Sequence, residues 1–325
     1  MKIGLIGVGA YGIAMAMMAN KKNKDIIMWT EDKSKYDKFL EDGCIKDVLE
    51  GVECPPNIKM TTSYEEVCKD RDIIFIMSTA HFVGSICKEI KNYITKDQVI
   101  CIASKGIENN SCEFLSNIAY EILKTKNICI ISGGSFAIDM ANNNPVALTV
   151  ASKCRKARKL VKEAMNNDTL KLRESRDVIG VQICGSIKNV IALAAGMLDG
   201  MGYPESTQCF LITESIHDIK ALIGALGGKP KTILSYAGVG DLLLTCTSTK
   251  SRNYSFGRLI GQGMSKDDKL EHLKNNTVEG YYTLKSIHKL VKKKKIDMPV
   301  VNLMYKIVMN DDDPHKLIDF LINKA

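Results

Sequence analysis

Short apolar runs alternate with helical patterns through the first half of the chain. Uninterrupted runs of this kind are typical of strands that are buried on both faces of a parallel sheet. Strands are predicted at residues 3–6, 25–29, 72–77, 98–103, 128–131, 146–151 and 169–172, and helices at 13–19, 64–69, 82–93, 112–123 and 155–166. This order predicts an α/β fold with a doubly wound, mostly parallel sheet.

The pattern changes at residue 178, beyond which it is helical. A long apolar helix is predicted over 178–201, and two polar loops are predicted at 237–241 and 245–253. The chain therefore divides into an α/β domain, residues 1–177, and an all-helical domain, residues 178–325. The charged segment that precedes Pro55-Pro56 is predicted to be irregular, since the two prolines block a helix.

Three glycines, Gly7, Gly9 and Gly12, follow the first predicted strand directly. Between a strand and a helix, the first glycine of this spacing permits a tight turn and the second lets a pyrophosphate approach the backbone. The third lets the helix pack closely on the strand. Because a helix N-terminus also attracts anions, the α/β domain is predicted to be a dinucleotide-binding Rossmann domain.

The second predicted strand ends at Thr30-Glu31-Asp32, a little more than about 20 residues beyond the glycines, where a carboxylate accepts hydrogen bonds from an adenosine ribose. The same charge repels a 2′-phosphate, so Glu31, or failing it Asp32, favours NAD, with NADP still possible. The alternative is a solvated loop acid or a helix N-cap, and Lys33 and Lys35 nearby weaken the NAD interpretation.

Two further strand ends are suited to binding an anion. Lys105 lies just past the strand at 98–103, and open α/β sheets bind ligands at that edge. The turn at 132–135 contains Gly133 and precedes a helix, so its N–H groups can hold an anion.

The long apolar helix carries Lys188 in its middle. A buried lysine needs a charged partner or has a lowered pKa, and both arrangements produce an acid–base group. The alternative is a lysine whose ammonium group extends to solvent along an apolar stem.

The loop at 245–253 gathers hydroxyls, a lysine, an arginine and an asparagine, the donors expected for a phosphate. A second polar turn, 276–280, contains Glu279, which is suited to binding sugar hydroxyls. The chain therefore carries predicted sites for both a phosphorylated substrate and a dinucleotide.

Composition narrows the remaining classes. The 45 basic and 37 acidic residues give a net charge of +8, but the basic runs lack interleaved aromatic residues, which argues against nucleic acid. The 11 cysteines form no C-x-x-C pair, so neither a metal site nor a disulfide framework is expected. No apolar run is expected to be long enough to span a bilayer, and a soluble cytoplasmic protein without membrane insertion is predicted.

The motifs resemble, in order along nearly the whole chain, those of NAD(P)-dependent glycerol-3-phosphate dehydrogenases. The resemblance runs through GVGAYG at residue 7, SKGIE at 104, SGGSFA at 132, DVIGVQICGSIKNVIALAAG at 177, GVGDLLLTCTSTKSRNYSFGRLIGQG at 238 and VEG at 278. It implies an N-terminal extended Rossmann domain, a helical C-terminal domain and a tendency to form homodimers. The implied reaction is hydride transfer between NAD(P)H and dihydroxyacetone phosphate, giving sn-glycerol 3-phosphate, a glycerophospholipid precursor.

The resemblance also implies residue roles. Lys188 would donate the proton to the substrate carbonyl, Asp241 would orient Lys188, and Lys105 would hold the substrate near the nicotinamide. Residues implied to contact glycerol phosphate are Gly133, Ser135, Ser251, Arg252 and Asn253, with Arg252 also reaching the cofactor. Residues implied to contact the dinucleotide are Ala10, Tyr11, Ala137, Thr277 and Glu279.

Some positions depart from the family pattern. Gly134 replaces a proline, the segment 78–81 replaces a proline-containing strand end, and Glu31 stands where a basic residue or histidine is common. Two rival interpretations remain at this point: a related two-domain reductase acting on a carboxylated substrate, and a non-catalytic NADH sensor in which Lys188 would be idle.

Overall fold

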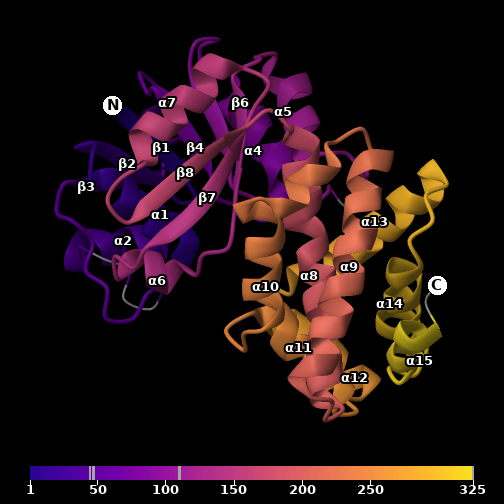
Figure 1. Cartoon of the computed structure of the whole chain (residues 1–325). Helices are drawn as coiled ribbons and strands as arrows, with labels where there is room; N and C mark the ends of the chain where they lie inside the picture. Colours follow the sequence, from indigo (N-terminus) through magenta and orange to yellow (C-terminus); the bar gives the residue numbers. More distant parts are fainter. Residues whose placement is uncertain (44, 46–47, 109–110, 324–325) are drawn as a thin grey trace. The chain divides into compact units, whose positions relative to one another are not determined.

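The computed structural model describes residues 1–43, 45, 48–108 and 111–323. By their contacts they form two compact units, and Figure 1 shows the elements of each. Unit 1 holds Met1–Ser104 and Leu115–Val178, and unit 2 holds Lys105–Phe114 and Ile179–Ala325. The segment Lys105–Phe114 thus belongs to unit 2, although it follows a strand of unit 1. The predicted single boundary after residue 177 does not include this segment.

Unit 1 is built on an eight-stranded sheet with the order β3-β2-β1-β4-β5-β6-β7-β8. All neighbouring strands are parallel except β6 and β7. The strands are β1 (Lys2–Ile6), β2 (Asp25–Trp29), β3 (Ile58–Thr61), β4 (Ile73–Ile76), β5 (Val99–Ile102), β6 (Ile128–Ser132), β7 (Val146–Ala151) and β8 (Leu170–Ser175). The predicted doubly wound, mostly parallel sheet is confirmed, and its order reverses between β1 and β4, where such sheets bind ligands.

Helices cover both faces of this sheet. They are α1 (Ala10–Asn20), α2 (Lys33–Asp42), α3 (Tyr64–Cys68), α4 (Val83–Ile90), α5 (Leu115–Leu123), α6 (Ala137–Ala141) and α7 (Arg155–Met165), with a 3-10 turn at Ala80–Phe82. Ile3 and Leu5 of β1 share one core with residues of α1, α6 and α7. Gly4 points to the other face, where a Cβ built on it would lie 2.1 Å from the carbonyl oxygen of Val67 in α3.

Two elements of unit 1 lie where the sequence predicted irregular chain or no element. Helix α2 forms because the Asp32 carboxylate accepts hydrogen bonds from the N–H groups of Ser34 and Lys35, and because Gly43 ends it with φ 69°. Only Phe39 of this helix is buried, so it leaves almost no apolar periodicity. Strand β3 has four residues at the sheet edge and was too short to stand out.

The described residues of unit 2 form helices and turns, with one short bridge between Ile107 and Phe114. Its helices are α8 (Val178–Gly200), α9 (Glu205–Ala225), η2 (Pro230–Leu234), η3 (Tyr236–Gly240), α10 (Asp241–Cys246), α11 (Arg252–Gly261), α12 (Lys266–Asn275), α13 (Glu279–Lys294), α14 (Pro299–Asn310) and α15 (Lys316–Asn323). Helix α8 is its core, since all residues from Gly180 to Leu198 are buried.

One sequence-based statement about α8 is wrong. Its most apolar 18-residue window has a mean hydropathy of 1.7, so by length and composition it does reach the range of a membrane span. However, 89% of that window is buried inside the fold. Among the described residues this is the one helix that meets the criterion, and its apolar surface is used in the core of unit 2.

Candidate active site

The glycine turn of unit 1 has the geometry that its sequence predicts. Gly7 has φ 115°, and a Cβ built on Gly12 would lie 2.1 Å from the carbonyl oxygen of Gly7, so both glycines are required by the protein itself. A Cβ built on Gly9 would meet no heavy atom within 4 Å. The Gly9 position is therefore open in front of the N-terminus of α1, which begins at Ala10, and this space suits a pyrophosphate.

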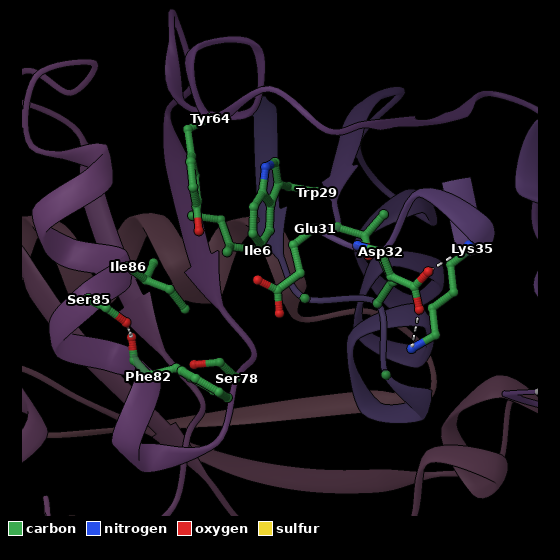
Figure 2. A pocket seen from close by; sticks show the side chains of 14 residues that line it. Ile6, Trp29, Glu31, Asp32, Lys35, Tyr64, Ser78, Phe82, Ser85 and Ile86 are labelled. Atoms are coloured by element: carbon green, nitrogen blue, oxygen red, sulfur yellow. Dashed lines mark hydrogen bonds and ion pairs between the residues drawn. The ribbon is translucent and has the colours of Figure 1, made fainter. Parts of the chain in front are cut away.

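A cavity of about 280 Å³ extends from this turn along the end of β2. Figure 2 shows the Glu31 carboxylate turned into the cavity, whereas Asp32 is turned toward Lys35. The Asp32 carboxylate is engaged as the N-cap of α2, and its pKa is lowered mainly by the Ser34 side chain that donates to it. Of the two acids that the sequence left open, Glu31 is the one that lines the cavity without capping a helix.

Two aromatic residues that sequence reasoning did not assign also line this cavity. Trp29 and Tyr64 stack with ring centroids 4.1 Å apart, and they form an apolar wall beside Glu31. Trp29 ends β2 and Tyr64 begins α3, so their place near the carboxyl edge of the sheet was the available signal. No local sequence pattern shows that the two rings stack. A flat aromatic wall beside a carboxylate suits the adenosine end of a dinucleotide.

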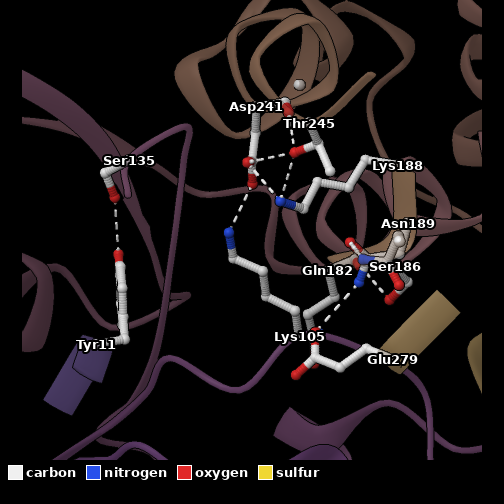
Figure 3. Close-up of polar contacts among 12 residues, drawn as sticks. Tyr11, Lys105, Ser135, Gln182, Ser186, Lys188, Asn189, Asp241, Thr245 and Glu279 are labelled. Atoms are coloured by element: carbon white, nitrogen blue, oxygen red, sulfur yellow. Dashed lines mark hydrogen bonds and ion pairs between the residues drawn. The ribbon is translucent and has the colours of Figure 1, made fainter. Parts of the chain in front are cut away.

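The second glycine turn lies between β6 and α6. A Cβ built on Gly133 would lie 2.9 Å from the carbonyl oxygen of Ala147, so this glycine is required by close packing against β7. The Ser135 hydroxyl lies 3.1 Å from the hydroxyl of Tyr11 in α1, which links the two glycine turns of unit 1 (Figure 3). Ala137 begins α6, next to this contact.

In unit 2 three charged residues that are distant in sequence meet (Figure 3). The Nζ of Lys188 donates to Oδ1 of Asp241 at 2.6 Å, and the Nζ of Lys105 donates to Oδ2 of the same carboxylate at 2.8 Å. Lys188 is 7% exposed and Asp241 is 1% exposed. The structure thus brings together the three residues implied to be catalytic.

Local structure explains how Asp241 and Lys105 are held. Asp241 is the first residue of α10, where a carboxylate is favoured by the helix dipole. Residues 237–241, predicted as a loop, instead form a π-helical turn that runs into α10, with non-helical torsions at Gly238. Lys105 is anchored because Ile107, two residues later, is buried in the core of unit 2.

Burial and charge set the protonation of this cluster. Burial, the largest cause, and the nearby charge of Lys105 together lower the pKa of Lys188 to about 8, against the attraction of Asp241, which raises it. Burial alone would raise the pKa of Asp241, but the ammonium groups of Lys105 and Lys188 hold it below its usual range. The cluster therefore pairs an ionised carboxylate with an ammonium group that can lose its proton near neutral pH.

Thr245 also belongs to this cluster, although the sequence analysis did not assign it a role there. Its hydroxyl donates to the carbonyl oxygen of Asp241 at 2.6 Å and accepts from Nζ of Lys188 at 2.9 Å. The i, i+4 spacing from Asp241 on one helix was the available signal. Among the described residues the Lys188 ammonium group donates to Asp241 and Thr245, which uses two of its three N–H donors and leaves one for a carbonyl oxygen.

The residues implied to bind phosphate lie at the start of α11. The Ser251 hydroxyl caps the helix by accepting from the N–H of Tyr254, and Arg252, its first residue, is exposed. Asn253 is instead buried in an amide network: its Nδ2 donates to Oδ1 of Asn189 at 3.0 Å, and its Oδ1 accepts from the N–H of Gly280 at 2.8 Å.

This network extends to the residues implied to contact the dinucleotide. The Nδ2 of Asn189 donates to Oε2 of Glu279 at 3.3 Å, and Glu279 begins α13. Thr277 is exposed two residues before that helix. Asn189 therefore joins Lys188, its neighbour in the chain, to both the start of α11 and the start of α13.

Metal ligation finds no support in the part of the chain that the structure describes, because His, Cys, Asp and Glu form no group of three there that could hold an ion. Its ten cysteines are free thiols, and Cys44 lies outside the described residues.

Comparison with known proteins matches both units to one family. Residues 2–158 match the N-terminal model, and residues 177–319 the C-terminal model, of NAD-dependent glycerol-3-phosphate dehydrogenase. A glycerol-3-phosphate dehydrogenase (NAD(P)+) of Thermoanaerobacter is 34% identical over 324 residues, covering 100% of this chain and 97% of the relative. One of Clostridium botulinum is 32% identical, covering 99% and 97%.

A solved structure agrees over the same length. The crystal structure of glycerol-3-phosphate dehydrogenase from Coxiella burnetii superposes with a TM-score of 0.93 at 27% identity, covering 99% of both chains. The family models span both units, and the relatives span nearly the whole chain. The chain therefore belongs to the NAD-dependent glycerol-3-phosphate dehydrogenase family, as the order of its motifs predicted.

Proposed function

We propose that this protein transfers a hydride between NAD(P)H and dihydroxyacetone phosphate, giving sn-glycerol 3-phosphate. Its family is one of NAD(P)-dependent oxidoreductases, which disfavours both the carboxylate reductase and the NADH sensor. The observation that carries the proposal is the buried cluster in which Asp241 bridges Lys188 and Lys105. Holding two ammonium groups on one buried carboxylate carries a desolvation cost, which an acid–base role accounts for.

Lys188 acts as the proton donor. The nicotinamide coenzyme, when bound, supplies the hydride. As the ketone carbon accepts it, negative charge develops on the carbonyl oxygen, and the remaining N–H of Lys188 stabilises that charge and transfers its proton. Asp241 and Thr245 fix the direction of the Lys188 ammonium group, and Lys105 provides a second positive charge for the substrate.

The phosphate of the substrate is bound by Ser251 and Arg252 at the N-terminus of α11, with Gly133 and Ser135 as further contacts. A ten-residue helix with unpaired N–H groups in its first turn, and an exposed guanidinium at its first residue, favours a dianion. Asn253 contributes by holding this terminus against Asn189 rather than by its own charge.

The coenzyme is bound by Gly7, Gly9, Ala10, Tyr11 and Gly12. Glu31, Ala137, Lys105, Arg252, Thr277 and Glu279 are further proposed contacts. The open space at Gly9 supports pyrophosphate binding. The Glu31 carboxylate in the cavity supports NAD in preference to NADP, because a carboxylate there accepts from ribose hydroxyls and repels a 2′-phosphate.

The biological setting is a proposal of the same kind. We expect a cytoplasmic homodimer that supplies a glycerophospholipid precursor, binds small phosphorylated metabolites, and neither inserts into membranes nor binds nucleic acid. The scattered basic residues and the burial of α8 inside unit 2 support the last two statements.

The assay that tests this proposal follows NADH consumption with dihydroxyacetone phosphate, and runs NADPH in parallel. A ketone that carries a carboxylate in place of the phosphate serves as the control substrate. We expect turnover only with the phosphorylated ketone and a higher kcat/KM with NADH. Turnover of the carboxylated ketone alone, or none with either, would reject the assignment.

A further inference from the structure

Helices α8 and α11 each carry two glycines four residues apart, and these four glycines face the other helix. A Cβ built on any of them would lie 2.0–2.2 Å from a backbone oxygen of the partner helix. The contacts are Gly196 with Tyr254, Gly200 with Arg258, Gly257 with Leu193 and Gly261 with Met197. The two backbones therefore touch directly, without side chains between them.

The register of these contacts shows that the two helices run in the same direction. Gly257 lies on Leu193, and one turn further along both helices Gly261 lies on Met197. One turn back, Asn253 donates to Asn189 at 3.0 Å. The glycine contact thus continues, turn by turn, into the amide pair at the proposed active site.

This crossing separates the two groups that the substrate has to reach at once. Lys188, the proton donor, precedes Asn189 on α8. Ser251 and Arg252, the proposed phosphate ligands, cap and begin α11 just before Asn253. The distance between proton donor and phosphate site is consequently set by backbone contact, which cannot adapt as side chains do.

We propose that the α8–α11 glycine crossing is a spacer that selects the substrate by length. This inference rests on the proposed function. It favours ketones in which a single methylene separates the carbonyl carbon from the phosphate ester oxygen over longer ones, because the crossing holds the Lys188 turn of α8 at a constant separation from the start of α11. The four glycines are positioning residues, since none of them is placed in contact with the substrate.

Packing alone is a weaker explanation for these glycines. Glycine is among the poorest helix formers, and alanine suffices for ordinary close packing of helices. Another glycine of unit 2, Gly224 in α9, shows the difference, because a Cβ built on it would lie 3.4 Å from Cγ of Pro230, an ordinary contact. At the crossing, by contrast, alanine would force the backbones apart by about 1 Å.

The test is the substitution Gly257→Ala, assayed with two ketones. One is dihydroxyacetone phosphate, and the other is 1,4-dihydroxybutan-2-one 4-phosphate, which has one more methylene between carbonyl and phosphate. Moving the two helix backbones apart by about 1 Å should lower kcat/KM for the shorter ketone by about 100-fold. The longer ketone should lose less, so that the ratio of the two kcat/KM values moves toward it by about tenfold or more.

Gly224→Ala is the matched control, because it makes the same change in a helix of the same unit and should leave the ratio where it is in the unsubstituted protein. Circular dichroism checks that each variant is folded. If Gly257→Ala does not fold, Gly200→Ala at the last residue of α8 replaces it, with a smaller shift of the ratio in the same direction.

An equal loss with both ketones, or no loss with either, would overturn the spacer and leave the proposed function standing. Failure of the unsubstituted protein to reduce dihydroxyacetone phosphate would instead overturn the proposed function, and the spacer with it.

Discussion

The two units present their ligand sites by different means. Unit 1 offers backbone: an open turn at Gly9, the N-terminus of α1, and a single carboxylate, Glu31, on the wall of a cavity. Unit 2 offers buried charge, since Lys188 and Asp241 are at most 7% exposed and pair with each other. Glycine has different uses in the two units. Gly9 leaves space for a ligand, whereas Gly257 lets two helices pack with their backbones in contact.

This difference predicts which property each unit loses when its residues are substituted. A backbone site tolerates changes of side chain but not the addition of one, so damage in unit 1 should appear as lost coenzyme affinity. A site of buried charges depends on each partner, so damage in unit 2 should appear as lost turnover.

Lys188→Ala should have the largest effect. Removal of a general acid lowers kcat by roughly 10²–10⁴-fold, whereas NADH affinity should stay nearly unchanged because Lys188 is not among the proposed coenzyme contacts. Steady-state kinetics and NADH fluorescence titration measure the two quantities. Lys269→Ala is the matched control, since Lys269 is equally buried in unit 2 but donates to Val308 and Asp311 instead.

The control variant should be less stable yet retain its turnover. Loss of both turnover and NADH binding in Lys188→Ala, in a protein that is still folded, would show that Lys188 is structural and that the contrast between the units does not hold.

Gly9→Ala should have the next largest effect, and it tests the backbone site of unit 1. The residue has φ −70° and ψ 171°, which alanine adopts readily, so the free energy of unfolding should not fall. The added methyl occupies the proposed pyrophosphate space and should weaken NADH binding by about tenfold or more, or ~1.4 kcal/mol.

Gly12→Ala is its counterpart, because its Cβ would meet the carbonyl oxygen of Gly7 at 2.1 Å. This clash should destabilise the fold by about 1–3 kcal/mol in denaturant unfolding. Unchanged NADH affinity in a stable Gly9→Ala protein would remove the pyrophosphate from this turn.

The smallest effect is expected at the two neighbouring acids. Glu31→Ser should raise kcat/KM with NADPH relative to NADH by several-fold, because the charge that repels the 2′-phosphate is gone. Asp32→Ala should leave that ratio unchanged and cost about 1 kcal/mol of stability through the lost N-cap. A change of coenzyme ratio in Asp32→Ala but not in Glu31→Ser would reverse the assignment of the two carboxylates.

The sequence could predict what depends on neighbouring residues. The turn at Gly7, Gly9 and Gly12 has a fixed spacing, and Lys188 stands out because it is the one basic residue in a long, mostly apolar helix. Most strands were predicted for the same reason, as continuous apolar runs. Helix α2 was missed because end caps rather than an apolar face stabilise it.

What could not be predicted depends on residues that meet only in the folded protein. The hydrogen bond from Lys188 to Thr245 and the amide pair of Asn189 and Asn253 join residues that are 57 and 64 positions apart in the sequence. Likewise, Lys105 packs with unit 2 because Ile107 is buried in the core of that unit. These contacts determine which polar groups face the substrate, so the residue types alone could not fix their roles.

The most direct test of the account is the pH dependence of kcat/KM for dihydroxyacetone phosphate in the unsubstituted enzyme. Lys188 has to be protonated to donate, and burial lowers its pKa to about 8. Reduction should therefore be constant below that pH and fall as the pH rises through it, while oxidation of glycerol 3-phosphate, which needs the neutral amine, should rise over the same range. A reduction rate that stays level until the ordinary lysine pKa of about 10.4 is approached would contradict a buried Lys188 as the proton donor.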